Sequence, residues 1–91
     1  MDILNAIPKR HPDIAWRAVV DEGLLVNPHN SQIYPLNPIG LRVWQESEGN
    51  KSVSSIIEEL FEEFDAPKDV LSQDIVEFVE KLQSENLLLI N

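Results

Sequence analysis

The hydrophobic positions of the chain change their spacing, from short apolar runs in the first part to a helical repeat in the second. Residues 14–20, 24–26 and 32–34 are rich in apolar and β-branched side chains, and clusters of turn-forming residues separate them. Three such runs in sequence predict an antiparallel meander. From Pro38 onward, apolar side chains recur at intervals of three and four residues, which predicts amphipathic helices.

Three helices are predicted after the strands. The first begins at Pro38 and runs to about Glu46, because Asn37 is a strong N-cap and proline lacks the N–H that would go unpaired at the first helical position. The second follows the N-cap Ser52, and the third starts near Pro67. The apolar face of the second consists of Val53, Ile56, Ile57, Leu60, Phe61 and Phe64. That of the third consists of Val70, Leu71, Ile75, Phe78, Val79 and Leu82.

A three-stranded antiparallel sheet followed by three helices is an α+β fold of the winged helix-turn-helix type. A length of 91 residues suits one domain spanning residues 1–91. Residues 1–13 show no sustained period and are predicted to be an irregular lead-in. The apolar residues 87–90 are expected to fold back on the core or to add a short strand.

The last predicted strand runs directly into the first helix through two prolines. Pro35 and Pro38 cannot donate to a sheet ladder, so this strand is short and is expected at a sheet edge. An edge strand has open backbone groups, which are either an aggregation hazard or a docking site for another chain. The side chain of Tyr34 faces either the core or a groove, and the pattern alone does not decide between them.

The charge of the chain is strongly acidic. Sixteen acidic against seven basic residues give a net charge of −9, which is opposite to what a nucleic-acid binder requires. Most of the acids lie from Glu46 onward, where only Lys51, Lys68 and Lys81 oppose them. They form either a solvated helix face or a surface that attracts a basic partner.

Motifs for chemistry are missing from the sequence. The chain has no cysteine, its two histidines stand in separate turn-rich segments, and its three glycines form no phosphate-binding loop. The paired carboxylates of the second helix point to solvent, where nothing tunes them for acid–base work. We therefore expect no enzyme activity, no metal and no cofactor. The lack of cysteine, of a membrane span and of a signal peptide is typical of a cytoplasmic protein.

A series of short elements follows one another along nearly the whole chain. They are Glu22-Gly23-Leu24-Leu25-Val26, Leu36-Asn37, Gly40, Val43-Trp44, Gly49, Ser52-Val53, Ile56-Ile57, Asp74-Ile75, Phe78, Leu82 and Leu87-Leu88. In order and spacing they resemble the PqqD-like proteins, the pyrroloquinoline quinone biosynthesis protein D family. The resemblance implies a winged-helix-like recognition element for ribosomally made, post-translationally modified peptides. Such an element binds the leader segment of a precursor and presents it to a modifying enzyme, often a radical S-adenosylmethionine enzyme.

The resemblance also implies where the leader binds. In that family the leader adds as an extra strand beside the third strand and lies in the groove between this strand and the third helix. The residues implied here are Gln32, Ile33, Tyr34 and Pro35 on the strand, and Val70, Asp74, Phe78 and Lys81 on the helix. Val70 and Phe78 fit the core equally well. A proline at position 35 departs from the usual family pattern and shortens the ladder, which leaves the pairing register open.

The sequence therefore predicts a noncatalytic peptide-binding chaperone that delivers a leader to a maturase. Two alternatives are a winged-helix transcription regulator, which the acidic third helix disfavours, and a structural docking domain for an enzyme subunit. The open strand edge and the aliphatic tail would serve a homodimer as readily as a leader, so the oligomeric state stays open.

Overall fold

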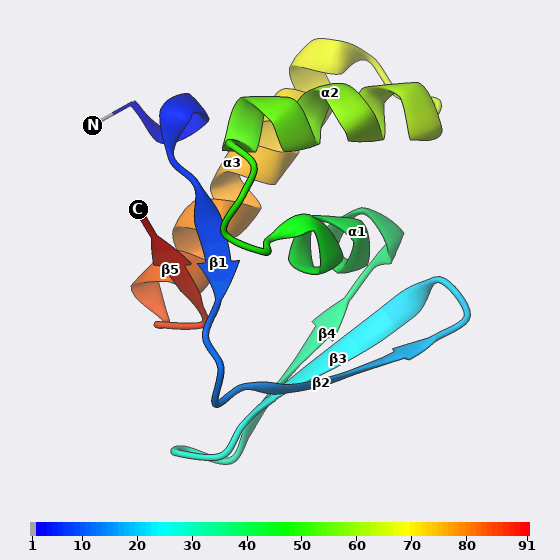
Figure 1. Ribbon diagram of the computed structural model, residues 1–91. Coiled ribbons are helices and arrows are strands. Elements are labelled where there is room, and N and C mark those ends of the chain that lie inside the picture. Colours follow the sequence, from blue (N-terminus) through cyan, green and yellow to red (C-terminus); the bar gives the residue numbers. More distant parts are fainter. Residues whose placement is uncertain (1) are drawn as a thin grey trace.

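The chain folds into two small antiparallel sheets and three α-helices (Figure 1). The structure is a computed structural model and describes residues 2–91. The strands are β1 (Pro8–Arg10), β2 (Ala15–Val19), β3 (Glu22–Asn27), β4 (Gln32–Leu36) and β5 (Leu88–Ile90). The helices are α1 (Pro38–Glu46), α2 (Val53–Glu63) and α3 (Lys68–Ser84), with a 3-10 turn, η1, at Ile3–Asn5. The predicted α+β fold, a three-stranded antiparallel sheet followed by three helices, is confirmed.

The larger sheet has the strand order β2-β3-β4, so β3 lies in the middle. Leu25 of β3 pairs with Trp16 on one side and with Tyr34 on the other. Within residues 2–91, no strand pairs with the outer edge of β4. The expected position of the third strand at a sheet edge is therefore observed.

The turn between β2 and β3 differs from the prediction. Residues 21–23 were expected to form it, but Val20 and Asp21 do, with Val19 and Glu22 as the closing pair. Val20 adopts a left-handed φ of 60°, an uncommon conformation for a β-branched residue, and its side chain is 95% exposed. Gly23 lies inside β3 instead. A Cβ at position 23 would stand 2.8 Å from Leu41 Cδ1. The lack of a side chain at Gly23 therefore allows α1 to approach the sheet.

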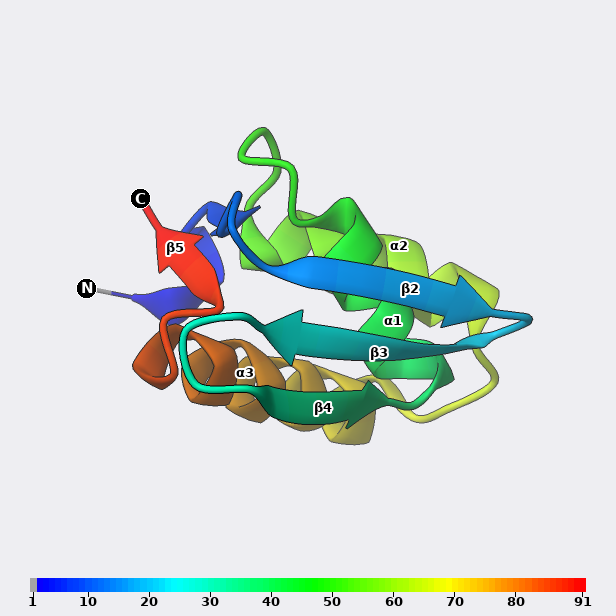
Figure 2. The same ribbon diagram turned by 90° about the horizontal axis from the view of Figure 1, so that it is seen from below.

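All three helices lie on one face of the larger sheet, and the opposite face is uncovered (Figure 2). Leu25 and Leu36 are buried on the helix side. On the uncovered side, large apolar side chains are partly exposed, namely Val19, Leu24, Val26 and Ile33. The core is completed by the apolar stripes of the helices, which include Leu41, Val43, Trp44, Val53, Ile56, Ile57, Leu60, Leu71, Ile75, Val79 and Leu82.

The predicted helix starts are confirmed for the first two helices. The Asn37 side chain accepts a hydrogen bond from the Gly40 N–H at 2.7 Å, and Pro38 is the first helical residue. The Ser52 hydroxyl caps α2 by accepting from the Ser55 N–H at 3.2 Å. The cap of α1 fixes the direction in which the chain leaves β4.

Both ends of the described chain meet in the second sheet. β1 pairs with β5, from Pro8 opposite Ile90 to Arg10 opposite Leu88. The expectation of a short terminal strand is therefore confirmed, whereas the prediction of an irregular lead-in is wrong for η1 and β1. Periodicity could not reveal β1, because three residues are too few for a period and a distant segment supplies their partner.

None of the helices within residues 2–91 is long and apolar enough to cross a membrane.

An ion-pair network joins α1 to α2 away from the open strand edge. Arg42 binds Glu63 with two hydrogen bonds, of 2.8 and 3.1 Å, and also contacts Glu46. Lys51 pairs with both Glu46 and Glu59. Much of the acidity of α2 is therefore neutralised locally, which favours the interpretation of these glutamates as a solvated helix face.

Glu46 makes the stability of the protein dependent on pH. Hydrogen bonds from Lys51 and Arg42 lower the pKa of Glu46 from 4.5 to about 2. Because the pKa is lower in the folded state, this contribution is present above about pH 4.5 and is lost as the pH falls toward 2. We expect thermal unfolding of the wild-type protein to depend on pH in this window more steeply than that of Glu46→Gln. Equal slopes would contradict the assignment.

Candidate functional site

The outer edge of β4 offers few backbone groups. The turn of β2 and β3 has two residues, and such a turn is flanked by a hydrogen-bonded pair, here Val19 and Glu22. The alternation of the ladder then directs the backbone groups of Ile33 and Pro35 toward the open edge. Pro35 has no N–H, so Ile33 supplies the single backbone donor of this edge within β4. The carbonyl oxygens of Ile33 and Pro35 are the two backbone acceptors of this edge.

A groove borders this edge, between β4 and α3. It consists of two adjoining hollows of about 470 and 400 Å³, which share Asn37, Phe78 and Lys81. The other residues of the first hollow are Glu22, Tyr34, Pro35, Leu36 and Leu82. The other residues of the second hollow are Ile39, Gly40, Asp74 and Glu77. We call the two hollows together the β4–α3 groove.

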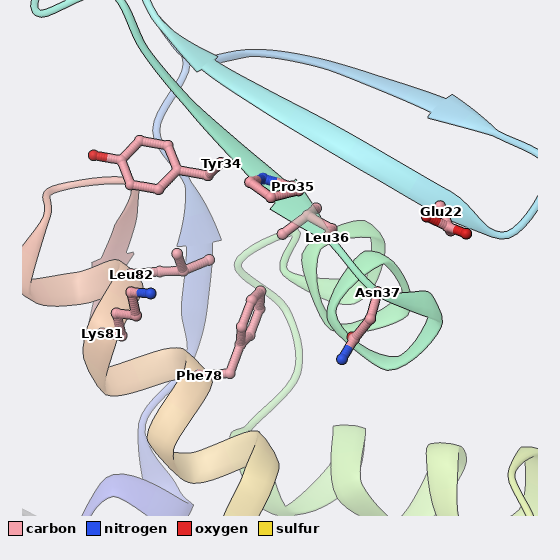
Figure 3. Close-up of a pocket in the computed structure, with 8 residues that line it drawn as sticks. All are labelled: Glu22, Tyr34, Pro35, Leu36, Asn37, Phe78, Lys81 and Leu82. Atoms are coloured by element: carbon pink, nitrogen blue, oxygen red, sulfur yellow. The ribbon is translucent and has the colours of Figure 1, made fainter.

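The first hollow has an apolar floor (Figure 3). Leu36 of β4 and Leu82 of α3 are both buried, and the Phe78 ring stands between α3 and the start of α1. Lys81 lies on the helix wall of the hollow, beside Leu82. A side chain that enters from the edge of β4 would therefore rest on apolar atoms and meet a charge at the wall.

Tyr34 closes one end of the groove. Its ring reaches toward the C-terminal end of α3, where its hydroxyl lies 3.0 Å from a Glu85 carboxylate oxygen and 2.5 Å from Gln32 Oε1. Loss of solvent around the ring, together with the hydrogen bond to Glu85, raises the pKa of Tyr34 above its usual value. The phenol is therefore protonated at neutral pH and can donate this hydrogen bond.

Gly40 lies at the opposite end, directly behind Phe78. A Cβ at position 40 would stand 3.2 Å from Phe78 Cε1 and 3.1 Å from Asn37 Oδ1. The absence of a side chain here lets α1 and α3 approach each other and leaves room for the ring. The width of the groove thus depends on a glycine in the first turn of α1.

We expect Gly40→Ala to narrow the groove without unfolding the protein. The new methyl group would push the Phe78 ring toward the open hollow, whereas alanine favours a helix by about 1 kcal/mol over glycine. Peptide binding should weaken by roughly threefold, equivalent to about 0.6 kcal/mol. The melting temperature should change little. Calorimetric titration and thermal unfolding would check both, and a large loss of stability would contradict this account.

Most of the residues implied by the sequence come together in the groove. Tyr34, Pro35, Phe78 and Lys81 line the first hollow, and Asp74 lines the second. Ile33 lies on the open edge with its side chain 61% exposed. Three of the implied residues line neither hollow: Ile33, Gln32, which is exposed, and Val70, which is 49% exposed.

Several groove residues were missed by the sequence analysis. They are Glu22, Leu36, Asn37, Ile39, Gly40, Glu77 and Leu82. Asn37 was predicted as the helix N-cap and Leu82 as part of an apolar helix face, and Gly40 was quoted only among the elements of the family resemblance. A signal existed for Glu77, because it lies one helical turn from Asp74 and from Lys81 on the polar side of α3.

Within residues 2–91, no group of three histidine, cysteine or acidic side chains could hold a metal ion.

The fold and the groove define a small α+β domain with an open strand edge beside an apolar hollow. Two solved structures share the fold. "TbiB1 in Complex with the TbiA(beta) Leader Peptide" has a TM-score of 0.76 and 21% sequence identity, and the match covers 88% of this chain and 93% of the other. "Lasso peptide synthetase B1 complexed with the leader peptide" has a TM-score of 0.77 and 17% identity, with coverage of 91% and 98%.

The family follows from the sequence. The family model of coenzyme PQQ synthesis protein D (PqqD) matches residues 22–88, which is well over half of the chain. The chain therefore belongs to the PqqD family, and the predicted resemblance is confirmed. No curated protein sequence matches the chain.

Proposed function

We propose that this protein is a noncatalytic recognition element that binds the leader segment of a ribosomally made precursor peptide. The leader adds as a strand to the open edge of β4 and lies in the β4–α3 groove. The single observation that carries this proposal is the unpaired edge of β4 beside an apolar hollow of about 470 Å³. Strand addition of this kind gains affinity from main-chain hydrogen bonds and specificity from pockets for alternate side chains.

Two further findings support the proposal. The chain belongs to the PqqD family, and both similar structures are described as complexes with leader peptides. The groove lining contains no histidine, cysteine or serine, so it offers no nucleophile–base pair of the Ser–His or Cys–His kind. The modifying enzyme that receives the leader is, in this proposal, a radical S-adenosylmethionine maturase.

The structure gives no support to the alternative of a transcription regulator. The groove side of α3 carries Asp74 and Glu77, which repel a phosphate backbone, and its one cation is Lys81. A nucleic-acid interface needs clustered positive charge, and α3 lacks it.

An NMR titration tests the proposed function. The probes are synthetic leader peptides from precursors encoded beside this gene, added to the isotope-labelled protein. We expect amide shifts to cluster on Ile33, on the neighbouring residues of β4 and on residues 74–82 of α3. A lack of shifts with every candidate peptide would contradict the proposal. Shifts on β2 instead would contradict the proposed site.

A further inference from the structure

The wall of the groove formed by α3 carries charges in a definite order. Asp74 and Glu77 line the hollow beside Gly40, Lys81 lines both hollows, and Glu85 lies at the Tyr34 end. The order along the groove is therefore acid, base, acid. Because the start of α1 lies beside Asp74 and Tyr34 lies beside Glu85, α3 runs antiparallel to β4 along this wall (Figure 2).

The charges in the middle of the wall have no oppositely charged partner in the described chain, although Glu77 accepts a hydrogen bond of 3.2 Å from the Gln73 side chain. Within residues 2–91, neither Lys81 nor Asp74 nor Glu77 takes part in an ion pair. The other two lysines in the C-terminal half differ, because Lys51 pairs with two glutamates and Lys68 with one. In a chain of net charge −9, a lysine on a groove wall without a carboxylate partner has its charge available to a ligand.

The spacing of these charges matches that of an extended peptide. Four residues of an α-helix advance by about 6 Å, at 1.5 Å per residue. Two residues of a strand advance by about 6.6 to 6.8 Å, and side chains two apart point to the same face. A strand added to β4 would therefore place successive helix-facing side chains beside successive turns of α3. One such side chain would meet Lys81, and the next would meet Glu77, which lies four residues before Lys81, with Asp74 about 4.5 Å further along the helix.

The hollows themselves fit long charged side chains. The floor around Phe78 is apolar and the charges stand on the wall, so an aliphatic stem would rest on the ring while its charged end reaches the wall. The hollow beside Leu36 suits a glutamate at its Lys81 side, because Glu22, the acid that also lines this hollow, lies on the opposite side. The hollow beside Gly40, with Asp74 and Glu77 on its wall, suits a lysine or an arginine.

We propose that the groove selects leader segments by charge order, with an acidic side chain opposite Lys81 and a basic side chain two residues away opposite Asp74 and Glu77. This inference rests on the proposed function, since it concerns the peptide bound in the same groove. Charge pairs at a partly exposed site contribute modestly to affinity and mainly select between partners. The recognised class is thus a leader with alternating acid and base along one strand face.

Selection from a displayed library of random ten-residue peptides tests this inference. We compare the wild-type protein with Lys81→Glu, which reverses the charge on the wall. With the wild type, the selected peptides should be enriched in acidic and basic residues two positions apart. With Lys81→Glu, the acidic position should become basic while the other preferences stay. A selected peptide with the acid–base pair should bind Lys81→Glu about tenfold more weakly than the wild type, from loss of attraction and gain of repulsion.

Lys68→Glu is the matched control. It makes the same change of charge on the same helix but outside the groove, and it should select the same peptides as the wild type. Selection of the same peptides by Lys81→Glu and the wild type would overturn the charge rule and leave the proposed function intact. Failure of every protein to select any peptide would overturn both.

Discussion

Replacement of Ile33 by proline is expected to weaken leader binding by about ten- to a hundredfold. Ile33 provides the single backbone donor on the open edge of β4, because Pro35 already lacks an N–H. Without that donor, a carbonyl of the incoming strand loses its partner, which costs about 1–3 kcal/mol. Calorimetric titration with a leader peptide identified by NMR measures the loss. Unchanged affinity would show that the peptide does not pair with this edge.

Ile33→Ala is the matched control for this prediction. It keeps the backbone donor and removes a side chain that is 61% exposed on the uncovered face of the sheet. Binding should change by less than about threefold, because the groove loses no contact. Both variants should stay folded, since the N–H of Ile33 points away from β3 and proline is tolerated on edge strands. Thermal unfolding followed by circular dichroism would verify this.

Replacement of Trp44 by alanine is expected to have the largest effect on stability. The indole is fully buried among residues of the core. Removing such a side chain costs about 3–5 kcal/mol, out of a total stability of about 5–15 kcal/mol for a typical small domain. We expect the variant to be largely unfolded or to melt far below the wild type. Denaturant unfolding would measure the change, and a loss below about 1 kcal/mol would contradict the central position of Trp44.

Trp44→Phe separates packing from hydrogen bonding at the same position. The Trp44 Nε1 atom is buried and has no hydrogen-bond partner within residues 2–91. An unsatisfied buried donor costs about 1–3 kcal/mol, and phenylalanine removes it while keeping an aromatic ring. We therefore expect Trp44→Phe to lose much less stability than Trp44→Ala. Similar losses in the two variants would mean that the polar atom is satisfied.

Much of the fold could be predicted because local signals agreed with the final structure. Asn37 and Pro38 specify a helix start by themselves, and the structure has that cap. The turn near Val20 could not be placed, because Gly23 carries a strong turn signal that in fact serves the close packing of Leu41. β1 was missed because it forms only with β5, which lies far away in the sequence.

The candidate site was predictable in outline and not in detail. The resemblance to the family placed Phe78 and Lys81 in the groove, and the structure lines the groove with both. It also implied Val70, which lies outside the groove. Helical spacing alone puts Val70 on the same face as Asp74, but only the position of β4 and α1 shows where the groove ends. Gly40 contributes through the space it leaves, which no side-chain pattern reveals.

The proline at position 35 has a consequence for how long a peptide stays bound. β4 offers a bound peptide strand one backbone donor and two backbone acceptors. The peptide and β4 therefore form few main-chain hydrogen bonds, which favours fast dissociation. Differences in affinity between related complexes arise mostly from their off-rates. Under the proposed function, we therefore expect a bound leader to dissociate rapidly, so that one molecule can deliver many precursors in succession.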